Sequence, residues 1–270
     1  MHPRKVPCLH QVRCLFWLAL LVFGLGACTG SRNEPARSEA EREGNPAEEV
    51  SPDAAPSTPE PVAEPTPAPP PPKDPLSTGL AKADLPLDGS GTYRWATGSS
   101  DPVGASPYRK YSVGIEEGLD IDPDAFAAFV DATYGDPRSW IGDGKRGFRR
   151  VESGGIKIVI AAPTTVDRQC LPLHTESTVS CAKNGYISIN LTRWEVAVEH
   201  WDGSLEDYRR YVVNHEMGHY LAELHEGCPS PGSPAPIMMQ QTYFLKGCVG
   251  NAWPYPELGT SEGKSAPETP

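Results

Sequence analysis

Three histidines and a glutamate lie close together near the C-terminal end of the chain, as His215-Glu216-Met217-Gly218-His219 followed by His225. Residues four apart share one face of an α-helix, so His215 and His219 can point their rings at one place, with Glu216 beside them. On a continuous helix, His225 would lie about 15 Å along the axis from His215 and out of reach. The spacing therefore predicts a helix that ends near Ala222, followed by a chain that turns back.

The residues that precede the motif also predict a helix around it. Ser204 can cap the helix, and Glu206 and Asp207 fall in the first turn, where the helix dipole favours negative charge. The residues that follow the three-and-four spacing of one buried face are Leu205, Tyr208, Tyr211, Val212, His215, His219 and Leu221. We expect the helix to span residues 205–221.

The motif has the ligand spacing of a catalytic zinc site. Such sites use three protein ligands and keep a fourth position for water, which makes His215, His219 and His225 the candidate ligands of a Zn²⁺ ion. Zinc lowers the pKa of a bound water toward about 7, and Glu216 is the candidate general base. Peptide-bond hydrolysis is the predicted chemistry. A lone HExxH sequence is also compatible with a metal-free helix turn, but the third histidine favours the metal site.

The motif and the residues after it resemble the zincin metallopeptidases, and among them the metzincin branch, whose signature is HExxHxxGxxH followed by a turn that contains methionine. The resemblance implies the same three zinc ligands and Glu216 as general base. It also implies a methionine turn at Met238 or Met239, within Pro236-Ile237-Met238-Met239-Gln240. Ala222 stands where the family has glycine, and a left-handed backbone there costs a residue with a side chain roughly 1–2 kcal/mol.

The chain also resembles a zincin-like actinobacterial family that is catalogued as a domain of unknown function. The stretches that carry this likeness are Tyr211-Val212-Val213-Asn214-His215-Glu216, Cys228-Pro229, Pro234-Ala235-Pro236, Gln240-Gln241-Thr242 and Asn251-Ala252-Trp253-Pro254. The resemblance runs through most of residues 91–256. It implies an α+β, zincin-like (metzincin-type) domain with a mixed β-sheet and an active-site helix, without an established substrate.

Tyr243 is a candidate donor to the oxyanion of a tetrahedral intermediate. In relatives of the resembled family a tyrosine follows the turn methionine by two residues, whereas Tyr243 follows Met239 by four. Packing of Tyr243 as a core aromatic is therefore an equal interpretation.

Four of the seven cysteines lie in the C-terminal two thirds of the chain: Cys170, Cys181, Cys228 and Cys248. An even number of cysteines in an exported domain favours two disulfides, and pairing of neighbours gives Cys170–Cys181 and Cys228–Cys248. The alternative is a structural zinc site. It is disfavoured because no two of the four have the C-x-x-C spacing that such sites prefer.

The N-terminal residues predict export and a membrane anchor. Arg4, Lys5 and Arg13 precede an apolar run over residues 14–25, shorter than the roughly 20 residues that a bilayer span requires, so residues 1–27 are a predicted lipoprotein signal peptide. Leu25-Gly26-Ala27-Cys28 resembles the bacterial lipobox, which implies a lipid on Cys28 and an extracytoplasmic protein held at the cell membrane. The alternative is an ordinary signal peptide cut near Ala27, and it also exports the chain.

Composition divides the remaining chain into three parts. Residues 31–88 carry 14 of the 30 prolines and almost no aromatic residues, so residues 28–90 are a predicted disordered linker behind Cys28. Much of the net charge of −11 lies there, and a basic stripe with interleaved aromatics is missing from the sequence, which argues against a nucleic-acid partner. Residues 91–256 are long enough for one domain, and residues 257–270 are a predicted disordered tail.

The pattern within residues 91–256 mixes strands and helices. Runs of β-branched residues predict strands at 111–115, 155–161 and 186–191. Asp122 can cap a helix with Pro123 in its first turn. Strands before the motif helix are compatible with the α+β fold that the resemblance implies.

The working hypothesis is a lipid-anchored, extracytoplasmic zinc metallopeptidase that acts on a peptide or protein substrate in the cell envelope. One alternative is a non-catalytic, zincin-shaped envelope binding module, and another is a hydrolase of cell-wall peptides or amides. Glu216 favours an enzyme over the binding module, because a purely structural metal site has no use for a general base.

The anchor can be tested at Cys28. Cys28→Ala should move the protein from the membrane fraction to the medium, because the short apolar run cannot retain the chain once it is cleaved. Cell fractionation and mass spectrometry of the N-terminus measure this. An unmodified N-terminus at any other residue, in a strain with normal lipoprotein processing, would reject the anchor.

Overall fold

The structure is a computed structural model, and it describes residues 72–259. The predicted signal peptide, the predicted lipid site at Cys28 and most of the predicted linker lie outside the described residues, as does most of the predicted tail. Within the described residues, no helix is long and apolar enough to cross a membrane.

Seven strands form one mixed sheet in the order β2-β4-β3-β5-β7-β6, and β1 pairs with β3. The strands are β1 (Tyr93–Trp95), β2 (Val103–Gly104), β3 (Arg109–Glu116), β4 (Gly147–Arg150), β5 (Ile156–Ala161), β6 (Cys181–Lys183) and β7 (Tyr186–Asn190). The pairs β3–β4, β3–β5 and β5–β7 are parallel, whereas β1–β3, β2–β4 and β6–β7 are antiparallel. The predicted mixed sheet and its three predicted strands, at β3, β5 and β7, are confirmed.

Alternating apolar side chains fix the register of the central strands. Ile158 of β5 pairs with Val113 on one side and with Ile187 on the other, and all three are buried. Because side chains alternate between the two faces of a strand, these residues point to one face together. That face carries the main core.

Within residues 72–259, four α-helices accompany the sheet: α1 (Pro123–Gly135), α2 (Pro163–Cys170), α3 (Leu191–Glu195) and α4 (Leu205–Tyr220). Three short 3₁₀ helices lie at Lys82–Asp84, Trp140–Asp143 and Pro256–Gly259. The predicted caps are confirmed, since the Asp122 side chain accepts hydrogen bonds at the start of α1 and the Ser204 side chain accepts one from the Asp207 backbone at the start of α4. The predicted motif helix over residues 205–221 therefore matches α4.

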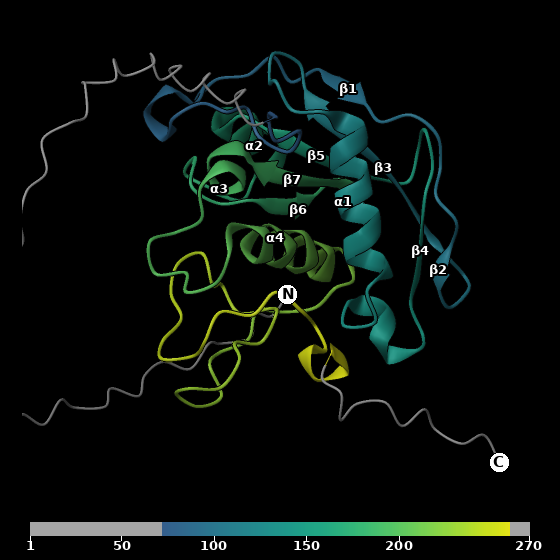
Figure 1. The fold of residues 1–270 in the computed structure, drawn as a ribbon, viewed down its shortest axis with the longest axis vertical. Coiled ribbons are helices and arrows are strands. Elements are labelled where there is room, and N and C mark those ends of the chain that lie inside the picture. Colours follow the sequence, from purple (N-terminus) through teal and green to yellow (C-terminus); the bar gives the residue numbers. More distant parts are fainter. Residues whose placement is uncertain (1–71, 260–270) are drawn as a thin grey trace, which may run out of the picture. The chain divides into compact units, whose positions relative to one another are not determined.

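The helices lie on both faces of the sheet (Figure 1). Phe126 of α1 and Val213 of α4 belong to the same buried cluster as Ile158 and Ile187. Val166 of α2 packs instead with Ala161 in a separate cluster on the opposite face. The helix α4 thus runs along the main core, beside the end of the sheet formed by β7 and β6.

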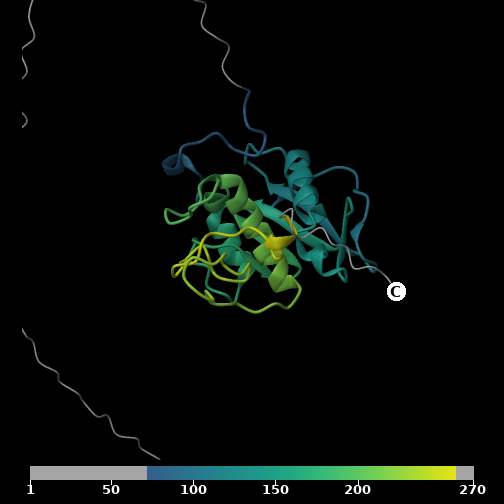
Figure 2. The same cartoon turned by 60° about the horizontal axis from the view of Figure 1, so that its bottom comes forward.

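Both predicted disulfides are present, with the predicted pairing: Cys170–Cys181 and Cys228–Cys248. The first joins α2 to β6, and the second closes the irregular segment that follows α4. Disulfides of this kind indicate an oxidising, extracytoplasmic location. Figure 2 shows the segment after α4, coloured from light green to yellow, gathered beside that helix.

Residues before position 91, the predicted start of the domain, pack against the helices and strands that follow. Leu85 is buried, the Trp194 indole donates to the Leu76 carbonyl at 2.7 Å, and the Glu195 carboxylate accepts from the Thr78 backbone at 2.7 Å. These contacts use backbone groups and one buried carboxylate from distant parts of the chain. The composition of residues 72–90, which is polar and rich in proline, does not reveal them.

Candidate metal centre

The three motif histidines meet at one place. His215 and His219 lie on α4 with ring centroids 4.8 Å apart, and the His225 ring lies 5.5 Å from the first and 4.6 Å from the second. One ligand nitrogen from each ring falls within 4.8 Å of the others. The predicted grouping of these histidines is therefore present in the structure.

A left-handed turn at the end of α4 brings His225 back to the helix. Ala222 has a φ of 68°, and its backbone N–H donates to the His219 carbonyl at 3.0 Å. The Glu223 N–H donates to the Gly218 carbonyl at 2.9 Å, which completes a Schellman motif. The helix thus ends where the spacing required, and Ala222 adopts the left-handed conformation that glycine adopts most easily.

Backbone carbonyls orient two of the rings. His215 Nδ1 lies 2.8 Å from the Ile237 carbonyl and His219 Nδ1 lies 3.3 Å from the Glu223 carbonyl. A carbonyl oxygen can only accept, so each Nδ1 carries the proton and each Nε2 keeps its lone pair. This is the usual outer support of a histidine that binds a metal ion. No side-chain pattern in the sequence predicts these two carbonyls, because both belong to the backbone.

Burial keeps the histidines neutral. Desolvation lowers the pKa of His215 to about 3, with a smaller opposing effect from its hydrogen bond to Ile237. Burial also lowers the pKa of His219 and of His225. Neutral imidazole is the form that binds metal, so these rings need not lose a proton to do so near neutral pH.

Glu216 is a buried carboxyl whose partner is missing from the described residues. Its Oε2 makes no hydrogen bond with them, and burial raises the pKa of Glu216 to about 8. A pKa of about 8 leaves the carboxyl protonated near pH 7, and a positive ion nearby favours the charged carboxylate instead. The three nitrogens and Glu216 together fit a site for one divalent ion with a water beside it.

The predicted methionine turn lies directly against the motif helix. A Cβ added to Gly218 would lie 2.2 Å from Met238 Sδ and 2.8 Å from Trp140 Cζ2, so glycine is required for this close contact. Met238 therefore packs under the helix between the two histidines of α4. Met239 is buried in a different cluster, with Ala235 and Cys248.

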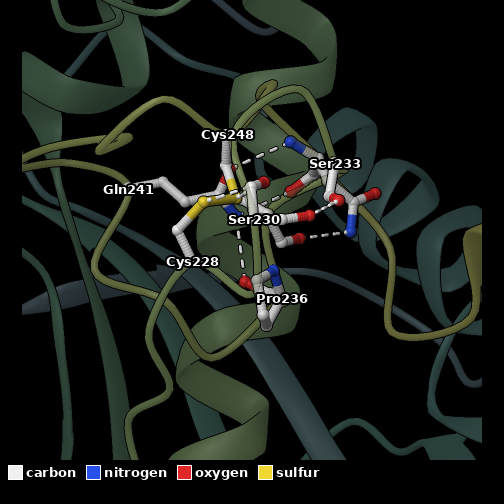
Figure 3. The surroundings of a disulfide bond; sticks show 8 residues. Cys228, Ser230, Ser233, Pro236, Gln241 and Cys248 are labelled. Carbon is white, nitrogen blue, oxygen red and sulfur yellow. Dashed lines mark hydrogen bonds between the residues drawn. A yellow bond between two sulfur atoms is a disulfide. The ribbon is translucent and has the colours of Figure 1, made fainter.

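The turn is held by a network in the segments on either side of it (Figure 3). The disulfide Cys228–Cys248 closes the segment, and Gln241 Nε2 donates to the Pro236 carbonyl at 3.4 Å. Gln241 and Asn251 also exchange hydrogen bonds of 2.9 Å between side chain and backbone. These contacts fix residues 236–239, and with them the Ile237 carbonyl that orients His215.

The histidines and Glu216 line a cleft of about 530 Å³. Besides α4, its lining comes from three parts of the chain: residues 173–175 and 179–183, which include the edge strand β6, residues 222–225 after α4, and Gln240, Thr242 and Tyr243 after the methionine turn. Tyr243 lines this cleft and is 45% exposed, so its interpretation as a packed core aromatic is wrong. Partial burial raises the pKa of Tyr243, so its phenol stays protonated at neutral pH.

A family model described as "Protein of unknown function (DUF3152)" matches residues 80–247. The chain belongs to this family. The matched range contains the three histidines, Glu216 and the other residues that line the cleft. The curated proteins and the solved structures give no match. Function must therefore be inferred from the geometry of the site.

The turn at Ala222 gives a direct test of this geometry. Ala222→Gly should stabilise the domain by about 1 kcal/mol, because glycine adopts a positive φ without the steric cost that alanine bears. Thermal unfolding should show a rise in Tm of roughly 2–4 °C for a domain of this size. Ala128→Gly, at an exposed position inside α1, is the matched control and should lower Tm. A fall in Tm for both variants would contradict a left-handed residue at 222.

Proposed function

We propose that the chain is a zinc-dependent metallopeptidase with a zincin-like fold. The observation that carries this proposal is the convergence of three neutral histidine nitrogens on one point beside a buried glutamate, inside an open cleft. Three nitrogen ligands that leave a fourth position for water are typical of catalytic rather than structural zinc sites, and Glu216 lies beside them.

The residues present fit a zinc ion. His215, His219 and His225 would hold it through their Nε2 atoms, and the two oriented rings are already supported by carbonyls. A bound zinc ion supplies Lewis-acid polarisation of a carbonyl and a lowered pKa for water.

Glu216 supplies the proton transfers in this proposal. Its carboxylate lies next to His215 on α4 and lines the same cleft. It takes a proton from the attacking water and then returns that proton to the amine that leaves. Tyr243, which lines the cleft as a protonated phenol, is the candidate donor to the oxyanion.

The edge of the sheet supports a peptide as the substrate. β6 is the last strand in the order of the sheet, and Cys181, Ala182 and Lys183 of this strand all line the cleft. An edge strand presents unpaired backbone N–H and C=O groups, which can pair with an extended peptide. A peptide or protein of the cell envelope fits both this edge and the extracytoplasmic location. The lipid anchor at Cys28 remains part of the proposal.

Glu216→Gln tests whether the site is catalytic. The glutamate is not a ligand, so the variant should keep its zinc and its Tm, yet lose about 10²-fold or more of its peptide hydrolysis because the general base is gone. Cleavage of a diverse peptide library by mass spectrometry measures activity, and elemental analysis measures zinc on the same samples.

Glu226→Gln is the matched control, because Glu226 is exposed, neighbours His225 and lies outside the cleft. Its activity should equal that of the wild type. Equal cleavage by wild type and Glu216→Gln would indicate a contaminating protease. A zinc-loaded wild type that cleaves nothing in the library would contradict the enzyme and favour the binding module.

A further inference from the structure

Exposed apolar side chains gather around the mouth of the cleft. Leu173 is 48% exposed, Leu224 is 82% exposed and Tyr243 is 45% exposed, and all three line the cleft. Large apolar residues that are exposed together around a cavity mark a binding surface, whereas single exposed ones are ordinary. The presence of these three exposed residues in the lining of one cleft therefore requires an explanation in terms of what the cleft binds.

The loop that carries Leu173 is held in place by a disulfide and by hydrogen bonds. The disulfide Cys170–Cys181 closes the loop, and the Leu173 N–H donates to the Cys170 carbonyl at 2.9 Å. Asp167 of α2 accepts hydrogen bonds from the Thr175 hydroxyl and, at 2.8 Å, from the Ser177 backbone. Leu173 is thus presented at the cleft by a fixed loop.

The segment that carries Leu224 is fixed as well. Leu224 lies between Glu223, which forms an ion pair with Arg146, and the candidate ligand His225. Its backbone follows directly from the Schellman turn that ends α4. The backbone around Leu224 is thus fixed by the contacts of its neighbours, while the leucine side chain itself is exposed.

We propose that Leu173 and Leu224 determine specificity, by receiving a large apolar side chain of a peptide that lies along β6 next to the scissile bond. The inference rests on the proposed function and adds the class of substrate to it. Contact with such a side chain removes apolar surface of both leucines and of Tyr243 from water. This burial is the favourable contribution that these exposed residues make to binding. Polar and charged side chains of a peptide gain no binding free energy from contact with these apolar residues.

The test uses quenched fluorogenic peptides that are identical except for the residues flanking the scissile bond, which are leucine, phenylalanine, serine or aspartate. The zinc-loaded protein should cleave the leucine and phenylalanine peptides with a kcat/KM at least about tenfold above that for serine or aspartate. Leu173→Ser and Leu224→Ser should each reduce this ratio of kcat/KM values several-fold, because each removes one apolar side chain from the cleft.

Leu171→Ser is the matched control. Leu171 is 58% exposed on the same loop as Leu173 but does not line the cleft. In Leu171→Ser, the ratio of kcat/KM for the apolar peptides to that for the serine or aspartate peptides should equal that of the wild type. Tm and zinc content should be unchanged in all three variants. An equal ratio in wild type, Leu173→Ser and Leu224→Ser overturns the proposal.

Binding of the same peptides to zinc-loaded Glu216→Gln separates this inference from the proposed function. Tighter binding of the leucine and phenylalanine peptides by this variant supports the specificity proposal even if the wild type cleaves nothing. Cleavage or binding without any preference for apolar residues overturns it while leaving a peptidase or a peptide-binding site in place. Loss of binding to phospholipid vesicles by Leu171→Ser and Leu224→Ser alike, with peptide preference unchanged, would assign the apolar rim to a membrane and also overturn the proposal.

Discussion

The arrangement of the site depends on one left-handed residue. At a φ of 68°, Ala222 ends α4 and reverses the chain, and three residues later His225 returns to the two histidines of the helix. A helix that continued through this position would carry His225 about 15 Å along its axis from His215. The cleft, the histidine cluster and the exposed Leu224 all follow from this reversal. The site therefore depends on a backbone conformation at Ala222 that is sterically unfavourable for alanine.

Residues 221–259, the described segment after α4, form one short 3₁₀ helix and otherwise have no helix or strand, yet they hold the site in place. Most of the segment's order comes from side chains that replace a hydrogen-bond ladder: Asn251 donates to the Ala235 and Trp253 carbonyls at 2.8 Å, and Tyr211 of α4 donates to the Met239 carbonyl at 3.0 Å. Buried amides that satisfy backbone groups in this way rigidify an irregular chain. The rigidity matters because the same segment supplies the Ile237 carbonyl that orients His215.

Local signals in the sequence were sufficient to predict the helix, the histidine cluster and the disulfides. They were not sufficient to predict contacts between residues far apart in the sequence. Ser204 and the histidine spacing predicted α4 and its end, because caps and periodicity act within a few residues. The two-residue turn at Asn184-Gly185, with φ values of 53° and 81°, joins β6 to β7 and is a recognisable hairpin signal, but β6 was not predicted. The packing of Thr78 on Glu195 joins residues 117 apart, which no local pattern encodes.

The measurement that tests the central claim most directly is the zinc content of the purified domain, by elemental analysis together with an anomalous diffraction signal at the site. We expect about one zinc per chain, and His225→Ala should weaken zinc affinity by more than the roughly 10- to 100-fold typical of lost outer-shell partners, because a ligand itself is removed. His174→Ala, which alters a histidine of the cleft outside the cluster, should leave the affinity unchanged. Protein that stays metal-free after purification with zinc, or an unchanged affinity in His225→Ala, would contradict the account.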